Sequence, residues 1–241
     1  MAYPRFLCAA LCATCLTFPL NAGESCIEDA IIVFDGSGSM SEMGFNDLDE
    51  PRIFEARRAL RRAIPDIAPF RRLGLVIYGP GPEEACHNID LRFAPQANAA
   101  PRLLAEVEAL RPSGDTPLTA AVGRAAAALG APSEPGTVVL VTDGKETCGG
   151  APCQLAAELA ADAPGLTVHV IGFKVRGEYF SWGSQGGSDY TETTTIAQCL
   201  ADQTGGKYVS TETVDELVAA LQDTLGCKLI GGLRVGPLPR G

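Results

Sequence analysis

Oxygen-bearing side chains alternate with glycine in the segment Asp35-Gly36-Ser37-Gly38-Ser39, which directly follows a short apolar run. This spacing lets one turn direct three side-chain oxygens towards one point. Magnesium prefers six oxygen ligands at about 2.1 Å in octahedral geometry, and it accepts hydroxyls and waters beside one or two carboxylates. The segment therefore predicts a divalent-cation loop, although Asp, Gly and Ser are also the ordinary residues of a turn after a strand.

Two later segments carry matching oxygen ligands. Thr116 precedes Pro117 and a predicted helix, and Asp143 follows a predicted strand in a Thr-Asp-Gly sequence. Each has a simpler interpretation, since a threonine can cap a helix and Asp-Gly is a common turn. All three segments, however, leave the same edge of one predicted parallel sheet. We therefore expect one metal site built from Asp35, Ser37, Ser39, Thr116 and Asp143.

The elements that must position these residues alternate between short β-branched runs and segments of helical periodicity. Strands are predicted at residues 30–34, 73–78, 89–93, 137–142, 167–173 and 207–210, and helices at 53–64, 99–110, 118–129, 154–161, 194–203 and 214–225. Pro65 is expected to end the first helix. Strands and helices alternating on this scale predict an α/β fold with a mostly parallel sheet covered on both faces.

The three ordered motifs resemble the metal ion-dependent adhesion site of the von Willebrand factor A-type domain family, whose pattern is D-x-S-x-S, then Thr, then Asp. The resemblance covers roughly Ile27 to Leu225. In the segment TDGKETCGGAPC, the sequence is similar to exported bacterial members of the family. It implies a doubly wound six-stranded sheet of order 3-2-1-4-5-6 with one antiparallel edge strand. It also implies a bound Mg²⁺, or Mn²⁺ or Ca²⁺, that takes a carboxylate ligand from a partner protein.

The amino-terminal segment has the layout of a secretory signal peptide. Arg5 is followed by an apolar run from Phe6 to Phe18, and cleavage is expected after Ala22. The run is too short to span a bilayer, and a lipid anchor on Cys15 is disfavoured by the preceding threonine. We expect a leader at 1–22, one domain at 23–227, a tail at 228–241, no membrane span, and a periplasmic or extracellular location.

The cysteines fit an exported chain. Cleavage would leave an even number of them, namely Cys26, Cys86, Cys148, Cys153, Cys199 and Cys227, which favours disulfides over a zinc cluster. A bridge from Cys26 to Cys227 would close the longest loop and is the first expectation. Cys148 and Cys153 form either a local bridge or the ends of longer bridges to Cys86 and Cys199.

The net charge of −10 disfavours nucleic acids and anionic membranes as partners. Arginines at helical spacing are expected to form a solvated face, with a binding patch as the alternative; they are Arg57, Arg58, Arg61 and Arg62, followed by Arg71 and Arg72. Acidic residues after the first loop are expected in an exposed polar loop rather than a second ion site; they are Glu42, Asp47, Asp49 and Glu50.

Three functions remain open. A metal-dependent protein-binding module, acting as a monomer or as a subunit of a complex, uses the predicted site most directly, and an envelope assembly factor would use the same site. A metal-dependent hydrolase is disfavoured, since His87 and His169 have no evident partners and an aspartyl-phosphate enzyme would carry a second Asp in place of Ser37. The aromatic-rich segment from Phe173 to Tyr190 starts at the ligand-binding edge of the sheet and is either functional or a self-packed loop.

Overall fold

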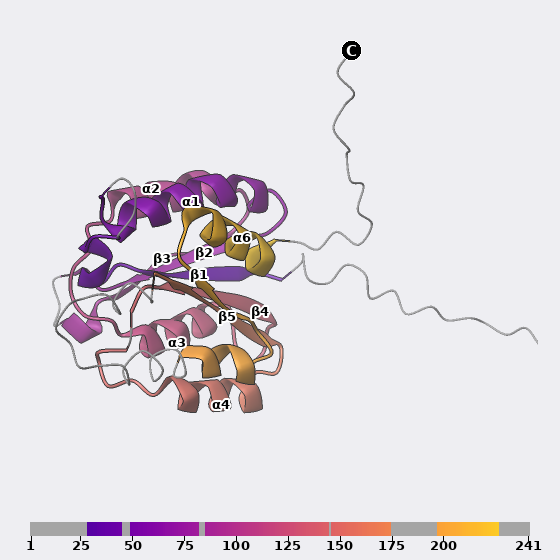
Figure 1. The fold of residues 1–241 in the computed structure, drawn as a ribbon. Helices are drawn as coiled ribbons and strands as arrows, with labels where there is room; N and C mark the ends of the chain where they lie inside the picture. The colour runs from indigo at the N-terminus through magenta and orange to yellow at the C-terminus, as the bar shows by residue number, and fades with distance from the viewer. Residues whose placement is uncertain (1–27, 45–48, 82–84, 145, 175–196, 227–241) are drawn as a thin grey trace, which may run out of the picture.

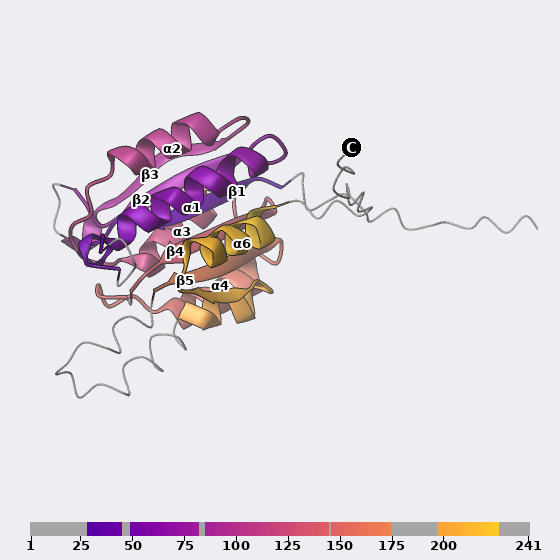
Figure 2. The ribbon, with the colours of Figure 1, turned by 45° about the horizontal axis from the view of Figure 1, so that its top comes forward.

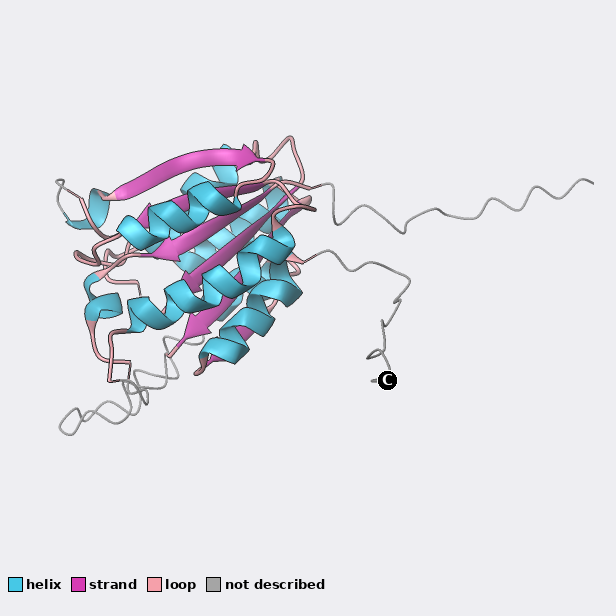
Figure 3. Ribbon diagram, turned by 90° about the horizontal axis from the view of Figure 1, so that it is seen from above, coloured by secondary structure: helices cyan, strands magenta, loops and turns pink. Residues whose placement is uncertain are grey.

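The computed structural model describes residues 28–44, 49–81, 85–144, 146–174 and 197–226. Its sheet has six strands in the order β3-β2-β1-β4-β5-β6. The strands are β1 (Ala30–Asp35), β2 (Leu73–Tyr78), β3 (Ile89–Gln96), β4 (Gly136–Thr142), β5 (Leu166–Phe173) and β6 (Tyr208–Thr211). All neighbours pair in parallel except β2 and β3, and Figure 3 shows the edge strand running opposite to the others. The predicted α/β fold, strand order and antiparallel edge are confirmed.

Helices cover both faces of the sheet (Figure 1). On one face lie α1 (Arg52–Ile67), α2 (Ala100–Ala109) and α6 (Val214–Leu225), and on the other lie α3 (Leu118–Ala128) and α4 (Pro152–Asp162). Short 3-10 turns, η2 (Gly38–Ser41) and η3 (Ala85–His87), follow β1 and precede β3. Residues 197–203 are also helical. Helix α6 packs beside α1 (Figure 2).

The central strand β1 explains the two cores. All six of its residues are buried, and because side chains alternate across a strand, they divide between the two layers. Ile32 and Phe34 pack with α1, α2 and α6, whereas Ile31 and Val33 pack with α3 and α4. A strand covered on both faces must be apolar along its whole length. The apolar run of β1 therefore favours the centre of the sheet, and Asp35 lies at the end of this central strand.

The first helix does not end at Pro65, as the sequence predicted; it continues to Ile67 with Pro65 inside. A proline removes one helical hydrogen bond, but Ile64 and Ile67 are both buried in the same apolar layer. Burial of this last turn therefore outweighs one missing hydrogen bond near the helix end.

Several sequence predictions fall outside the described residues. These are the leader at 1–22, the tail at 228–241, the Cys26–Cys227 bridge and the aromatic segment beyond Lys174. Within the residues described, no helix has both the length and the apolar character needed to cross a membrane.

Two disulfides lie within the described residues. Cys86 is bonded to Cys148, and Cys153 to Cys199. Of the two arrangements left open by the sequence, the longer bridges are therefore present and the local Cys148–Cys153 loop is not. The Cys86–Cys148 bridge ties η3 to the segment that follows Asp143.

Candidate metal centre

The first loop turns its oxygens inward. Asp35 is fully buried at the end of β1, and its Oδ1 accepts hydrogen bonds from the Ser37 amide at 2.9 Å and the Ser37 hydroxyl at 2.6 Å. The hydroxyls of Ser37 and Ser39 lie 3.0 Å apart. Three side-chain oxygens therefore share one small volume, as the alternating spacing predicted.

Strand β4 brings Asp143 to the same place, because it pairs directly with β1. The Ser39 hydroxyl donates a hydrogen bond of 2.7 Å to Asp143 Oδ1. The preceding residue, Thr142, donates to the other oxygen of Asp35 at 2.7 Å, and the Tyr78 hydroxyl donates to Thr142 at 3.1 Å. Both oxygens of the Asp35 carboxylate therefore accept hydrogen bonds, one from the loop after β1 and the other from β4, and the β4 donor is itself bonded to Tyr78 of β2.

The segment that carries Thr116 lies against the first loop. The Ser113 amide donates to the Gly36 carbonyl at 2.9 Å, and the Gly38 amide donates to the Gly114 carbonyl at 3.0 Å. Gly114 has a φ of +79°, and a Cβ there would lie 2.3 Å from the Gly79 carbonyl oxygen. Only glycine fits this close approach. The fold therefore places the second segment directly beside the first.

Thr116 itself is buried and is joined to the Asp143 segment. Its amide donates to the Thr147 hydroxyl at 2.8 Å, and its carbonyl accepts from the Thr147 amide at 3.2 Å. Thr116 does not cap α3, since the N-cap residue is Pro117 and no side-chain cap is made. Glu146 bonds the start of α3 instead, accepting from the Thr119 amide at 2.9 Å and the Thr119 hydroxyl at 2.6 Å.

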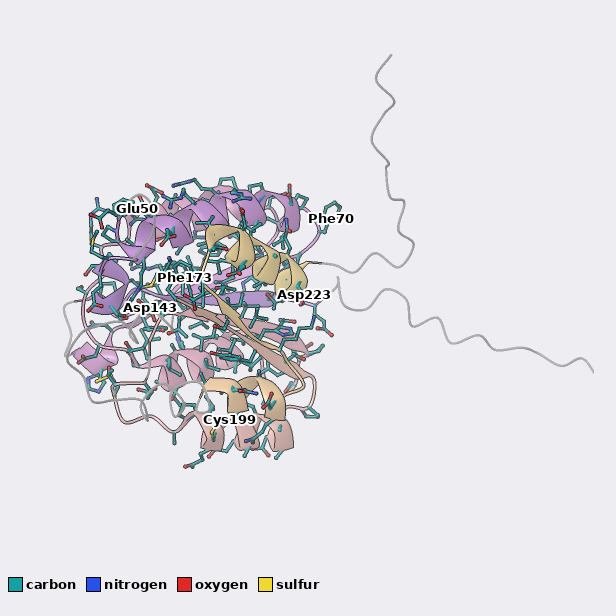
Figure 4. All side chains as sticks on the ribbon, viewed as in Figure 1. Glu50, Phe70, Asp143, Phe173, Cys199 and Asp223 are labelled. Atoms are coloured by element: carbon teal, nitrogen blue, oxygen red, sulfur yellow. A yellow bond between two sulfur atoms is a disulfide. The ribbon has the colours of Figure 1, made fainter. Side chains whose placement is uncertain are left out.

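Arg52 is a site residue that the sequence did not single out. It is the first residue of α1 and only 2% exposed, and its Nη1 lies 2.9 Å from Asp143 Oδ2. Figure 4 labels Asp143 at the same end of the molecule as Glu50, which lies just before α1, and opposite to Phe70. A sequence signal existed, because a cation in the first helical turn opposes the helix dipole and needs a compensating carboxylate.

The two carboxylates repel one another. Burial raises the pKa of Asp143 to about 7, and the negative charge of Asp35 adds to this rise, while the Ser39 hydroxyl and Arg52 oppose it. Burial and the Asp35 charge also raise the pKa of Tyr78, which keeps its hydroxyl protonated as a donor. Two acidic groups facing one another in a buried site favour an added positive charge.

The donor chemistry fits a hard divalent cation. Asp35, Ser37, Ser39 and Asp143 present only carboxylate and hydroxyl oxygens to one another, and oxygen ligands with few carboxylates are what Mg²⁺ requires. Cys86, Asp115 and Cys148 also lie close together, but their two sulfurs are bonded to one another and are not free as ligands.

The arginine-rich face is solvated only in part: Arg61, Arg62 and Arg72 are exposed, as expected, whereas two other arginines are buried. Arg57 is buried and donates to the carbonyls of Val107 and Leu110 at 3.1 and 2.6 Å, and Arg71 is buried and donates to Thr137 at 2.7 Å. The other four form ion pairs: Arg58 with Glu50, Arg61 with Glu108, Arg62 with Asp215, and Arg72 with Asp29. These arginines therefore join α1 and its flanks to neighbouring elements.

The remaining predictions concern acidic and histidine side chains. Glu50 pairs with Arg58, and Glu42 lies 3.6 Å from Arg52 with 65% of its side chain exposed, while Asp47 lies outside the described residues. His169 has a structural role, because its Nδ1 accepts a hydrogen bond from the Lys207 amide at 3.0 Å.

Comparisons with known proteins agree with the fold. The model of the von Willebrand factor type A domain matches residues 30–146. The uncharacterized protein YwmC of Bacillus subtilis (strain 168) is 27% identical over 195 residues, which cover 73% of this chain and 83% of that protein. The three segments of the candidate metal centre lie within residues 30–146.

Solved structures resemble the chain at the level of fold. Proximal thread matrix protein 1 from the mussel byssus has a TM-score of 0.52 and 20% identity over 82% of this chain and 47% of its own. The PilB minor pilin from Streptococcus sanguinis has a TM-score of 0.56 and 17% identity over 86% and 61%. A further structure of the mussel protein has its metal ion-dependent adhesion site occupied by zinc. The chain spans less than two thirds of either protein.

Proposed function

We propose that this chain, whose residues 30–146 match the von Willebrand factor type A domain, is an exported protein-binding module that engages its partner through a divalent cation. One observation carries the proposal. Asp35, Ser37, Ser39 and Asp143, from two separate segments, form one hydrogen-bonded cluster of oxygen donors at the carboxyl edge of the sheet. Open α/β sheets bind ligands at that edge.

The cation would be Mg²⁺, or Mn²⁺ or Ca²⁺, held by Asp35, Ser37, Ser39, Thr116 and Asp143, directly or through water. When bound, it supplies a positively charged centre with a free coordination position for a carboxylate of the partner. Ser37, Ser39 and Thr116 contribute neutral hydroxyls, so among these ligands only Asp35 and Asp143 offset the ion's charge. The zinc-occupied site of the mussel matrix protein supports a divalent ion for a site of this type.

Two further features support export and binding. The disulfides Cys86–Cys148 and Cys153–Cys199 suit an oxidising compartment, in agreement with the leader predicted at 1–22. A pilin and a byssus matrix protein share the fold, and this favours a module that binds, or that assembles into an envelope complex, over a hydrolase.

The experiment compares Ser39→Ala with Ser41→Ala in the mature protein. The Ser39 hydroxyl bonds Asp143, whereas the Ser41 hydroxyl, in the same turn, bonds only the Gly38 carbonyl at 2.6 Å among the contacts described. Mg²⁺ or Mn²⁺ is expected to raise the Tm of the wild type and of Ser41→Ala, and to raise that of Ser39→Ala much less. An equal rise in all three proteins would contradict the site.

Partner binding is tested by affinity capture from envelope extract, in Mg²⁺ and in EDTA, with the same three proteins. A captured protein that requires Mg²⁺ and is lost with Ser39→Ala supports metal-bridged recognition. A captured protein that is unchanged by EDTA would show that the partner binds elsewhere.

A further inference from the structure

Arg52 occupies a position that is electrostatically unfavourable on its own. It is the first residue of α1, where the unpaired amides of the helix carry partial positive charge, and its side chain is 2% exposed. A buried cation at this end of a helix needs a carboxylate to offset the loss of water. The carboxylate that it meets belongs to the candidate metal centre.

One guanidinium nitrogen of Arg52 faces three acceptors. Its Nη1 lies 2.9 Å from Asp143 Oδ2, 3.4 Å from the Ser39 carbonyl and 3.6 Å from Glu42 Oε2. The Asp143 side chain is 0% exposed and that of Glu42 is 65% exposed. Arg52 therefore contacts a buried carboxylate that belongs to the site and lies near an exposed one that does not.

The formal charges show what this contact does. In their ionised forms Asp35 and Asp143 give the cluster two negative charges, and Arg52 offsets one of them. A divalent cation would then leave one net positive charge, which a carboxylate of a partner would neutralise. Without Arg52, the empty cluster would carry the full repulsion of its two carboxylates, and the metal-loaded cluster would be neutral.

We propose that Arg52 is the counter-ion of the metal-free site. In this role Arg52 stabilises the fold without metal and weakens the binding of a divalent cation. It also keeps the metal-loaded site positively charged for an acidic partner. This proposal rests on the metal site of the proposed function. When a cation draws Asp143 towards itself, Glu42 is the exposed carboxylate that remains within reach of Arg52.

The test is a calorimetric titration of Mn²⁺ into the mature protein and its variants. Arg52→Gln is expected to bind Mn²⁺ at least about tenfold more tightly than the wild type, because one positive charge is removed from beside the ion. Arg52→Lys keeps that charge and should remain within about threefold of the wild type. Arg62→Gln removes a charge from the same helix at an exposed pair with Asp215 and should leave the affinity unchanged, because solvent and salt screen it.

Thermal unfolding of the same proteins separates a counter-ion from a packing residue. In EDTA, Arg52→Gln is expected to unfold at a lower temperature than the wild type, and with saturating Mn²⁺ most of this deficit should disappear. A residue that only packs would lower the Tm equally in both conditions. If Arg52→Gln does not fold in EDTA, it is purified in Mn²⁺, and its affinity is measured by competition with a chelator.

A double-mutant cycle with Glu42→Gln tests the role of Glu42. In the wild-type background, Glu42→Gln removes a negative charge and leaves Arg52 only a weaker, neutral acceptor at this position, so Mn²⁺ affinity should fall. In the Arg52→Gln background only the smaller direct charge effect remains. An equal effect in both backgrounds would overturn the shift of Arg52 towards Glu42.

The outcomes for Arg52 and for the metal site can be told apart. If neither the wild type nor Arg52→Gln binds Mn²⁺, the proposed metal site is wrong. If the wild type binds Mn²⁺ and Arg52→Gln binds it equally or more weakly, the metal site stands and the counter-ion role of Arg52 is overturned.

Discussion

The first turn of α1 makes two buried ion pairs of opposite polarity at the same edge of the sheet. Arg52 meets Asp143 after β4 at 2.9 Å, and Glu55 meets Lys174 after β5 at 3.2 Å. All four side chains are at most 8% exposed. The two pairs are alike in type, burial and place in the fold, yet only one belongs to a candidate site.

The difference lies in what surrounds each pair. Asp143 also accepts a hydrogen bond from the Ser39 hydroxyl and is repelled by the charge of Asp35. The Arg52–Asp143 pair therefore lies beside further oxygen atoms that could bind a metal and beside a second negative charge. Lys174 is bonded to the Gly44 carbonyl at 2.7 Å, and its ammonium lies 5.9 Å from the centre of the Phe173 ring. The Glu55–Lys174 pair is balanced in charge and joins α1 to the end of β5. We call this pair the clamp.

A buried ion pair therefore says little about function by itself. What marks the Arg52–Asp143 pair is the excess negative charge and the neutral hydroxyls next to it, which favour an added cation. The clamp has no such excess. Perturbing the two pairs should accordingly have different consequences for stability and for metal binding.

Breaking the clamp should have the largest effect on stability. Lys174→Met leaves Glu55 buried without its cation and the Gly44 carbonyl without its donor, so we expect a loss of about 3 kcal/mol in the free energy of unfolding. The loss, measured by urea denaturation, should be the same in Mg²⁺ and in EDTA. A loss that Mg²⁺ repairs would mean that the clamp belongs to the metal site.

Removing the charge of Asp143 should lower the free energy of unfolding less than breaking the clamp does, but it should abolish the effect of Mg²⁺ on the Tm. Asp143→Asn keeps one oxygen, which can accept from Arg52, while its amide can donate to the Ser39 hydroxyl. Because the change also removes the repulsion with Asp35, we expect a loss of about 1 kcal/mol in the free energy of unfolding in EDTA. Mg²⁺ should no longer raise the Tm. A Tm rise equal to that of the wild type would show that Asp143 does not help to hold the ion.

A pH effect is expected outside both pairs, at His169 in β5. Burial, together with the charges of Lys207 and Arg71, lowers the pKa of His169 to about 4. The unfolded chain then takes up this proton first, so the stabilising contribution is complete above pH 6.5 and is lost as the pH falls towards 4. In His169→Gln, the free energy of unfolding should fall less, or rise more, than in the wild type as the pH is lowered through this interval, and an unchanged dependence would contradict the assignment.

The smallest effect is expected at an exposed pair on the same helix. Arg62 lies 2.6 Å from Asp215, but the two side chains are 55% and 82% exposed. Replacing Arg62 by Gln should change the free energy of unfolding by less than about 0.5 kcal/mol. Urea denaturation at low and high salt measures this change, and a loss comparable to that of Lys174→Met would show that burial is not what separates these pairs.

Most of the fold could be predicted from the sequence, because the central strands are short apolar, mostly β-branched runs buried on both faces. Leu73–Tyr78 and Val214–Leu225 have the predicted bounds. Pro65 was misjudged because local chemistry favours ending the helix, while burial of Ile67, a tertiary effect, extends it. The burial of Arg57 and Arg71 was missed for a related reason, since helical spacing does not reveal which neighbouring elements supply carbonyls and carboxylates.

The candidate site was only partly visible in the sequence. Alternating oxygens and glycines indicated the loop at Asp35, and the order of the segments indicated Asp143. Arg52 and Thr142 were missed, because their roles depend on contacts with residues 91 and 107 positions away along the chain. The unfavourable charge of Arg52 at a helix start was the signal available for the first of these.

The most direct test of the metal centre counts bound Mn²⁺ by electron paramagnetic resonance during titration of the mature protein. We predict one Mn²⁺ per molecule in the wild type and in Ser41→Ala, with an affinity at least about tenfold lower in Ser39→Ala, a loss equal to about 1.4 kcal/mol. Absence of stoichiometric Mn²⁺ binding in the wild type, or equal binding by all three proteins, would contradict the account.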